Sequence, residues 1–102
     1  MSDKTGIQLM IVETGRRYGE AYFRGLAMEE CGELIQVLNK LNRLEGGEYG
    51  GMEAELKDRL FEEIADVEVV LQVLKNKYRC ENEVYEWKRR KLERQAERNR
   101  EE

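Results

Sequence analysis

The sequence contains no proline and no histidine in 102 residues, and it has only two cysteines. Without proline, long helices can continue with no forced break. Without histidine, and with Cys31 and Cys80 far apart, the chain lacks zinc-site spacings and the Glu-x-x-His motifs of di-iron helical bundles. It also lacks a signal-peptide pattern and an apolar run of about 18 residues. We therefore expect a cytoplasmic protein with no membrane-spanning segment.

Charged residues make up 39% of the chain, and the mean hydropathy is −0.80. Such values would suit a disordered chain, but the apolar residues recur at regular helical spacings. The length predicts one domain over residues 1–102. A chain this short buries a small core, so we expect a homodimer or homotetramer.

The net charge is −4, but it is unevenly distributed. Residues 88–102 hold seven Lys or Arg and four Glu, a balance of +3, which leaves −7 for the preceding residues. This distribution gives no large unopposed basic surface, so we expect no stable nucleic-acid complex.

The apolar periodicity predicts helices and no strands. The predicted helices cover residues 5–18, 20–44, 52–77 and 81–98, with a charged tail at 99–102. The segment "EGGEYGG", residues 45–51, has four glycines and is predicted to be a flexible loop, a type of segment that often acts as a lid. The expected fold is all-α and resembles a four-helix bundle.

The two long helices each place acids on an apolar face. In the segment 20–44 that face comprises Leu26, Ala27, Leu34, Val37, Leu38 and Leu41. Glu30 falls in its middle and Glu33 at its edge. In the segment 52–77 the face comprises Leu56, Leu60, Val67, Val70, Leu71 and Leu74. Here Glu63 is central and Asp66 lies one turn along, at the edge, so both acidic pairs have i,i+3 spacing.

Four carboxylates converging in an apolar groove would repel one another and lose hydration. Hard divalent cations relieve both effects, and all-oxygen ligation favours Mg²⁺ or Mn²⁺. The alternative is that the acids lie beside the apolar faces and are merely solvated.

Two motifs extend this interpretation. "EECGE" (29–33) and "EEIADV" (62–67) resemble the E-E-x-x-E and E-x-x-D motifs of MazG-like, all-α nucleoside triphosphate pyrophosphohydrolases. The similarity covers roughly residues 20–98. It implies that Glu30, Glu33, Glu63 and Asp66 bind the metal, with Glu29 and Glu62 as accompanying acids.

The resemblance implies Mg²⁺-dependent hydrolysis of a ribo- or deoxyribonucleoside triphosphate to a monophosphate and pyrophosphate, with Glu30 or Glu29 accepting the proton of the attacking water. Relatives place basic residues of the last helix near the phosphates. Here Lys91, Arg94 and Arg98 share a helical face, and Lys40 is a further candidate. Base stacking would fall to Tyr22 or Phe23.

Two other functions remain open at this stage. A phosphoribosyl-ATP pyrophosphohydrolase shares the chemistry and the helical architecture. A non-catalytic helical module for oligomerisation or regulation would need none of these roles.

Overall fold

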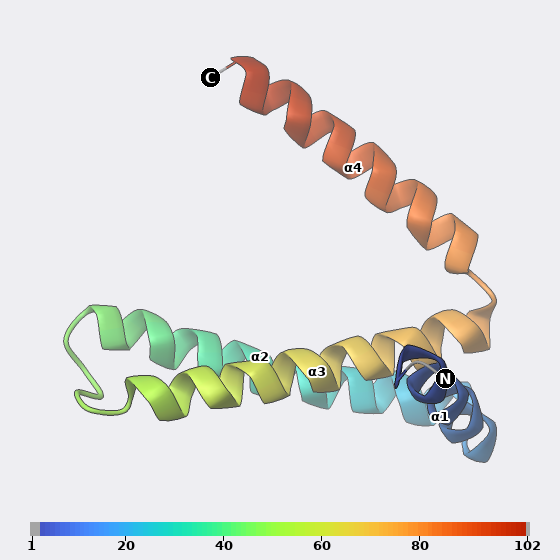
Figure 1. Ribbon diagram of the computed structural model, residues 1–102, viewed down its shortest axis with the longest axis horizontal. Helices are drawn as coiled ribbons and strands as arrows, with labels where there is room; N and C mark the ends of the chain where they lie inside the picture. The colour runs from blue at the N-terminus through green and yellow to red at the C-terminus, as the bar shows by residue number, and fades with distance from the viewer. Residues whose placement is uncertain (1–2, 102) are drawn as a thin grey trace.

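The computed structural model describes residues 3–101 as four helices, with no strand among them (Figure 1). The helices are α1 (Asp3–Arg17), α2 (Glu20–Glu45), α3 (Glu53–Tyr78) and α4 (Glu81–Glu101). The predicted all-α class and four helices are confirmed. The last helix continues through most of the expected tail, and Glu102 lies outside the described residues. Within residues 3–101, no helix combines the length and apolar character needed to cross a bilayer.

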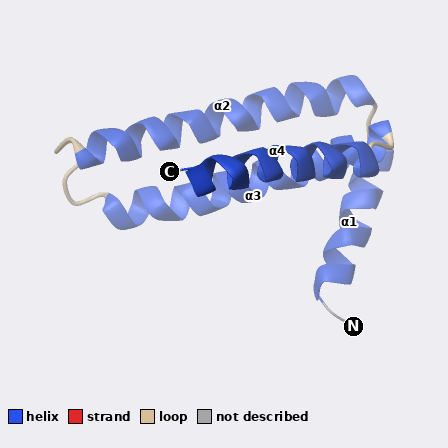
Figure 2. Ribbon diagram, turned by 90° about the horizontal axis from the view of Figure 1, so that it is seen from above, coloured by secondary structure: helices blue, strands red, loops and turns tan. Residues whose placement is uncertain are grey.

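Helices α2 and α3 form an antiparallel hairpin along the length of the molecule (Figures 1 and 2). The residues at which the two helices meet recur at alternating spacings of three and four, the pattern that keeps a stripe of residues on one side of a helix. We call the two facing stripes the seam. In α2 the seam comprises Phe23, Ala27, Glu30, Leu34, Val37, Leu41 and Leu44. In α3 it comprises Leu56, Leu60, Glu63, Val67, Val70 and Leu74.

The seam is narrower than the sequence predicts. Leu38 and Leu71, which were expected on the apolar faces, are each 44% exposed. Each follows a seam position by one residue, so each lies on a flank of the hairpin. Two helices that meet alone bury only a narrow stripe of each, and the neighbouring apolar residues stay uncovered.

Helix α1 packs across one end of α3 (Figure 2). The contact is close because Gly15 is buried there, and a Cβ atom on it would lie 3.4 Å from Cγ1 of Val73. Ile11 packs against the core cluster of Phe23, Val70 and Val73. One end of the hairpin is therefore a three-helix unit.

The glycine-rich segment is an ordered turn at the opposite end. Its backbone hydrogen bonds include Glu48 N to Arg43 O at 2.9 Å, and Gly47 and Gly51 have φ values of 98° and 85°. By helical rise, Glu45 lies about 18 Å along α2 from Glu33. The turn is thus remote from the acidic residues, and the structure gives it no lid-like position over them.

The turn between α3 and α4 is fixed by several hydrogen bonds. Arg79 caps α3 in the left-handed conformation (φ 53°, ψ 45°), and Cys80 N donates to Lys75 O at 3.1 Å. The Glu81 carboxylate accepts hydrogen bonds from Gln72 Nε2 at 3.0 Å and from Lys75 Nζ at 3.3 Å.

Beyond this turn, α4 diverges from the hairpin (Figure 1). Among the described elements it contacts only α3, and none of its residues is buried. A single copy of the chain is therefore a hairpin crossed by α1, with a projecting fourth helix, and it does not close a four-helix bundle.

Candidate metal centre

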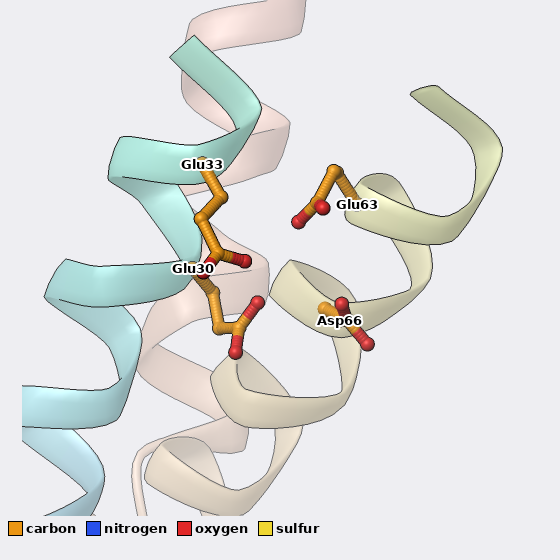
Figure 3. Close-up of side chains that lie close together, drawn as sticks. All are labelled: Glu30, Glu33, Glu63 and Asp66. Atoms are coloured by element: carbon orange, nitrogen blue, oxygen red, sulfur yellow. The ribbon is translucent and has the colours of Figure 1, made fainter. Parts of the chain in front are cut away.

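The antiparallel hairpin brings the two acidic pairs together midway along its length. One carboxylate oxygen from each of the four acids lies within 4.8 Å of the others. Figure 3 shows Glu33 opposite Glu63 and Glu30 opposite Asp66. The i,i+3 spacing places each pair on adjacent turns, and opposite chain directions align the pairs. We call these four residues the acidic cluster.

The members of the acidic cluster differ in burial. Glu30 and Glu63 occupy seam positions that are otherwise apolar, and Glu63 is only 7% exposed. Glu33 and Asp66 lie on one flank of the hairpin, the flank to which α1 packs through Val73. Within the described residues, Oε2 of Glu30 and Oε2 of Glu63 are buried without a hydrogen-bond partner. Unpaired buried oxygens are unfavourable, and a cation bound between them would supply the missing interactions.

The surroundings of these carboxyls disfavour their charged forms. Burial, followed by the charges of Asp66, Glu33 and Glu63, raises the pKa of Glu30 to about 6. Burial, followed by the charge of Glu33, also raises the pKa of Glu63. Clustered carboxylates within an apolar seam produce these shifts. A cation between them would reverse the effect by favouring the charged forms.

The donor set fits a hard divalent cation. Neighbouring oxygens around Mg²⁺ are about 3 Å apart and opposite ones about 4 Å, so small side-chain rotations would bring the cluster to that geometry. Only oxygens are offered, which suits Mg²⁺ or Mn²⁺ better than Zn²⁺. Cys31 follows Glu30 in the sequence but is exposed on the opposite flank of the hairpin, so it does not join the cluster.

The accompanying acids Glu29 and Glu62 are exposed and lie outside the acidic cluster. Of the two residues expected as proton acceptors, the structure places only Glu30 among the four clustered acids.

The two aromatic candidates for base stacking differ in the structure. Phe23 is 2% exposed and belongs to the core cluster, so the expected contact with a base is wrong for this residue. It was predicted because Tyr22 and Phe23 precede the first acidic motif, where the relatives that the motif resembles often contact the nucleobase. The seam spacing instead assigns Phe23 to the core. Tyr22 is 50% exposed and stacks on Tyr18 with a 4.2 Å centroid separation, so it remains available.

The basic residues of the last helix are not brought to the acidic cluster within one copy. Lys91, Arg94 and Arg98 are exposed on α4, which contacts only α3 and is anchored to it through Glu81. The expected cationic strip exists as a helix face, but a single chain leaves it away from the acids. Helical periodicity correctly predicted the helix and the face that these residues share. It contains no information about the direction of that helix relative to the hairpin.

Two other basic residues share the flank of Glu33 and Asp66. Lys40 follows Glu33 by seven residues, and Arg59 precedes Asp66 by seven, so both lie two turns toward the glycine-rich turn. No described acid forms an ion pair with either of them. Lys40 was predicted from the sequence as a phosphate-binding residue. Arg59 was not, although its seven-residue spacing from Asp66 places it on the same helix face.

Comparisons with protein-family models, with curated proteins and with solved structures found no match to this chain. The two motifs and the geometry of the acidic cluster are therefore the features of the chain that indicate a function.

Proposed function

We propose that this protein is a magnesium-dependent nucleotide pyrophosphohydrolase, which hydrolyses a ribo- or deoxyribonucleoside triphosphate to a monophosphate and pyrophosphate. One observation carries the proposal: Glu63 is 93% buried, its Oε2 has no hydrogen-bond partner among the described residues, and one of its carboxylate oxygens lies within 4.8 Å of oxygens of Glu30, Glu33 and Asp66 (Figure 3). Solvated acids of a structural module would not need this arrangement. The resemblance of "EECGE" and "EEIADV" to the MazG-like motifs gives the reaction class.

The acidic cluster supplies the metal ligands in this proposal. A bound Mg²⁺ would neutralise phosphate charge and lower the pKa of a coordinated water. The protein holds all four carboxylates on two helices packed against each other, so their positions are set before the substrate binds. Mn²⁺ would serve with the same ligands.

Proton transfer is assigned to Glu30. Its Oε2 has no hydrogen-bond partner among the described residues, so this atom is free to accept a proton. The proton of the attacking water would move to this atom.

The phosphate groups would extend from the acidic cluster toward Lys40 and Arg59. Both side chains lie on the flank that carries Glu33 and Asp66, and Arg59 can bind a phosphate through two N–H groups. Tyr22 lies about 12 Å from Glu30 along α2, on the side away from Lys40. This arrangement would place the base and the terminal phosphates at opposite ends of the site.

Product analysis tests the proposal. The protein with Mg²⁺ is incubated with each standard ribo- and deoxyribonucleoside triphosphate, and the products are separated by chromatography with a parallel pyrophosphate assay. We expect monophosphate and pyrophosphate from one or a few substrates. Glu63→Gln should lower turnover at least 100-fold, whereas Glu62→Gln, at an exposed position, should stay near wild type. Diphosphate with orthophosphate, or equal activity of both variants, would contradict the proposal.

A further inference from the structure

Helix α4 carries a basic side that the acidic cluster does not use. Its members are spaced at i, i+3, i+4, i+7 and i+11, which keeps them on one side of a helix. They are Trp87, Arg90, Lys91, Arg94 and Arg98. We call these residues the basic face. It extends about 17 Å along the helix axis.

The helix separates its acids from the basic face. Arg89 lies outside the basic face and binds the carboxylates of both Glu86, at 3.0 Å, and Glu93. Among residues 3–101, no acid forms an ion pair with a cation of the basic face. The face therefore carries +4, from three Arg and one Lys, although residues 88–102 together carry only +3. That lower balance was the reason to expect no stable nucleic-acid complex, and it does not describe the folded helix.

An exposed aromatic side chain lies at the centre of the basic face. Trp87 is 54% exposed, and the guanidinium carbon of Arg90 lies 5.3 Å from the centroid of its ring. Nucleobases stack on indole rings and beside guanidinium groups, with little dependence on the identity of the base. The pair thus offers a stacking surface within a row of cations.

The hairpin leaves the basic face uncovered. Helix α4 contacts only α3 among the described elements, and none of its residues is buried (Figure 1). Glu81 binds Gln72 and Lys75 of α3, which marks the side of α4 that faces the hairpin. Lys88 lies on that side too, in a groove with Leu71. By helical geometry the basic face is about a third of a turn away.

A single nucleic-acid strand fits this combination better than other anionic partners. Neighbouring cations on the face are about 5–6 Å apart, so several phosphates of one strand can be contacted at once. An acidic protein surface would pair with the cations but would leave Trp87 without a stacking partner. A duplex keeps its bases inside the helix, away from the indole ring.

We propose that the basic face of α4 binds a single strand of RNA or DNA, with its cations on phosphates and Trp87 stacked on a base. This binding uses none of the four clustered acids, so it does not rest on the proposed hydrolysis and needs no divalent cation. Four phosphate contacts predict an affinity loss of about 50-fold between 50 and 200 mM KCl.

Tryptophan fluorescence measures the stacking directly, because Trp87 is the only tryptophan in the sequence. The protein in EDTA is titrated with short oligo(U) and oligo(dT), and with inorganic polyphosphate as a polyanion without bases. We expect saturable quenching by either oligonucleotide and none by polyphosphate, and the tighter oligonucleotide identifies the preferred sugar. No quenching at 50 mM KCl, or equal quenching by polyphosphate, would overturn the proposal.

Fluorescence anisotropy of labelled oligonucleotides tests the cations. The double variant Arg94→Gln/Arg98→Gln should weaken binding about 10-fold and roughly halve the dependence of log affinity on log salt. Arg43→Gln/Lys57→Gln is the matched control. It removes the same charge from side chains that pair with Glu48 and Glu53 beside the glycine-rich turn, and it should bind like wild type.

Three results of these titrations would contradict the assignment. Equal losses in the two double variants would show that only overall charge matters. Competition by a duplex as effective as that of the single strand would remove the role of Trp87. A change of oligomeric state in Arg94→Gln/Arg98→Gln, without oligonucleotide binding by wild type, would assign the basic face to a contact between copies of the chain.

Discussion

Glu33 and Glu63 face each other across the α2–α3 hairpin, with carboxylate oxygens less than 4.8 Å apart (Figure 3). Glu63 occupies a seam position that any ordinary helical hairpin would fill with an apolar residue. Without a cation, this pair weakens the middle of the hairpin; the proposed cation would join the two helices through the same residues.

Divalent cations should raise the melting temperature. At ten times its dissociation constant, a ligand of the folded state adds about 1.4 kcal/mol, which corresponds to several degrees for a domain of this size. Circular dichroism melts with MgCl₂, compared with NaCl at the same ionic strength, measure the effect. Glu33→Gln should remove most of the shift and Glu62→Gln should preserve it. Equal shifts in both variants would place the cation outside the acidic cluster.

The metal-free protein should lose stability as the pH rises through about 6. Burial and neighbouring carboxylates raise the pKa of Glu30 to about 6 from 4.5, and the pKa of Glu63 is also raised. Between these pH values the folded chain holds protons that the unfolded chain releases, so proton binding stabilises the folded state. This contribution to the free energy of unfolding is complete below pH 4.5 and is lost as the pH rises through 6.

Urea unfolding in EDTA at pH 5, 6, 7 and 8 measures this dependence. Glu30→Gln has no carboxyl to titrate at this position, so its unfolding midpoint should vary less over the same range. A wild-type midpoint that rises from pH 5 to 7 would contradict the raised pKa of Glu30. With Mg²⁺ present the trend should reverse, because the cation binds the deprotonated carboxylates.

Replacing Glu63 with leucine should stabilise the metal-free protein. The change removes a buried, unpaired carboxylate and fills a seam position with an apolar side chain. We expect a rise in melting temperature of roughly 5 °C at pH 7.5, together with loss of the response to Mg²⁺. Glu62→Leu, at an exposed position, should give no comparable gain. A less stable Glu63→Leu chain would show that Glu63 has structural partners.

Lys40 and Arg59 should act on substrate binding. If both contact phosphates, Lys40→Ala and Arg59→Ala should each raise KM about 10-fold, with a smaller effect on kcat. Arg43→Ala is the control, since Arg43 pairs with Glu48 at the glycine-rich turn (3.7 Å). Steady-state kinetics on the best substrate of the panel provides the measurement. An unchanged KM in both variants would show that the substrate phosphates do not bind at this flank.

Helical periodicity was sufficient to predict the helices. It also predicted that four acids from two distant segments of the sequence lie close together in the fold. Glu30 and Glu63 could be assigned because each interrupts an apolar series at its centre. Leu38 and Leu71 could not be assigned correctly, because the sequence does not say whether one helix or several cover a face. The direction of α4 relative to the hairpin could not be predicted from the sequence pattern either. It depends on Arg79 in the left-handed conformation and on the bonds of Glu81, which have no periodic signal.

The acidic cluster also divides the seam into two apolar segments. One contains Phe23 and Val70 and is supported by α1; the other contains Val37 and Leu56 and ends at the glycine-rich turn. Polar residues between two small cores limit how far unfolding of one spreads to the other. In the metal-free chain, amide hydrogens near the turn should therefore exchange sooner than those near α1. Cation binding would couple the two segments into a single cooperative unit, so exchange protection along the hairpin would become uniform.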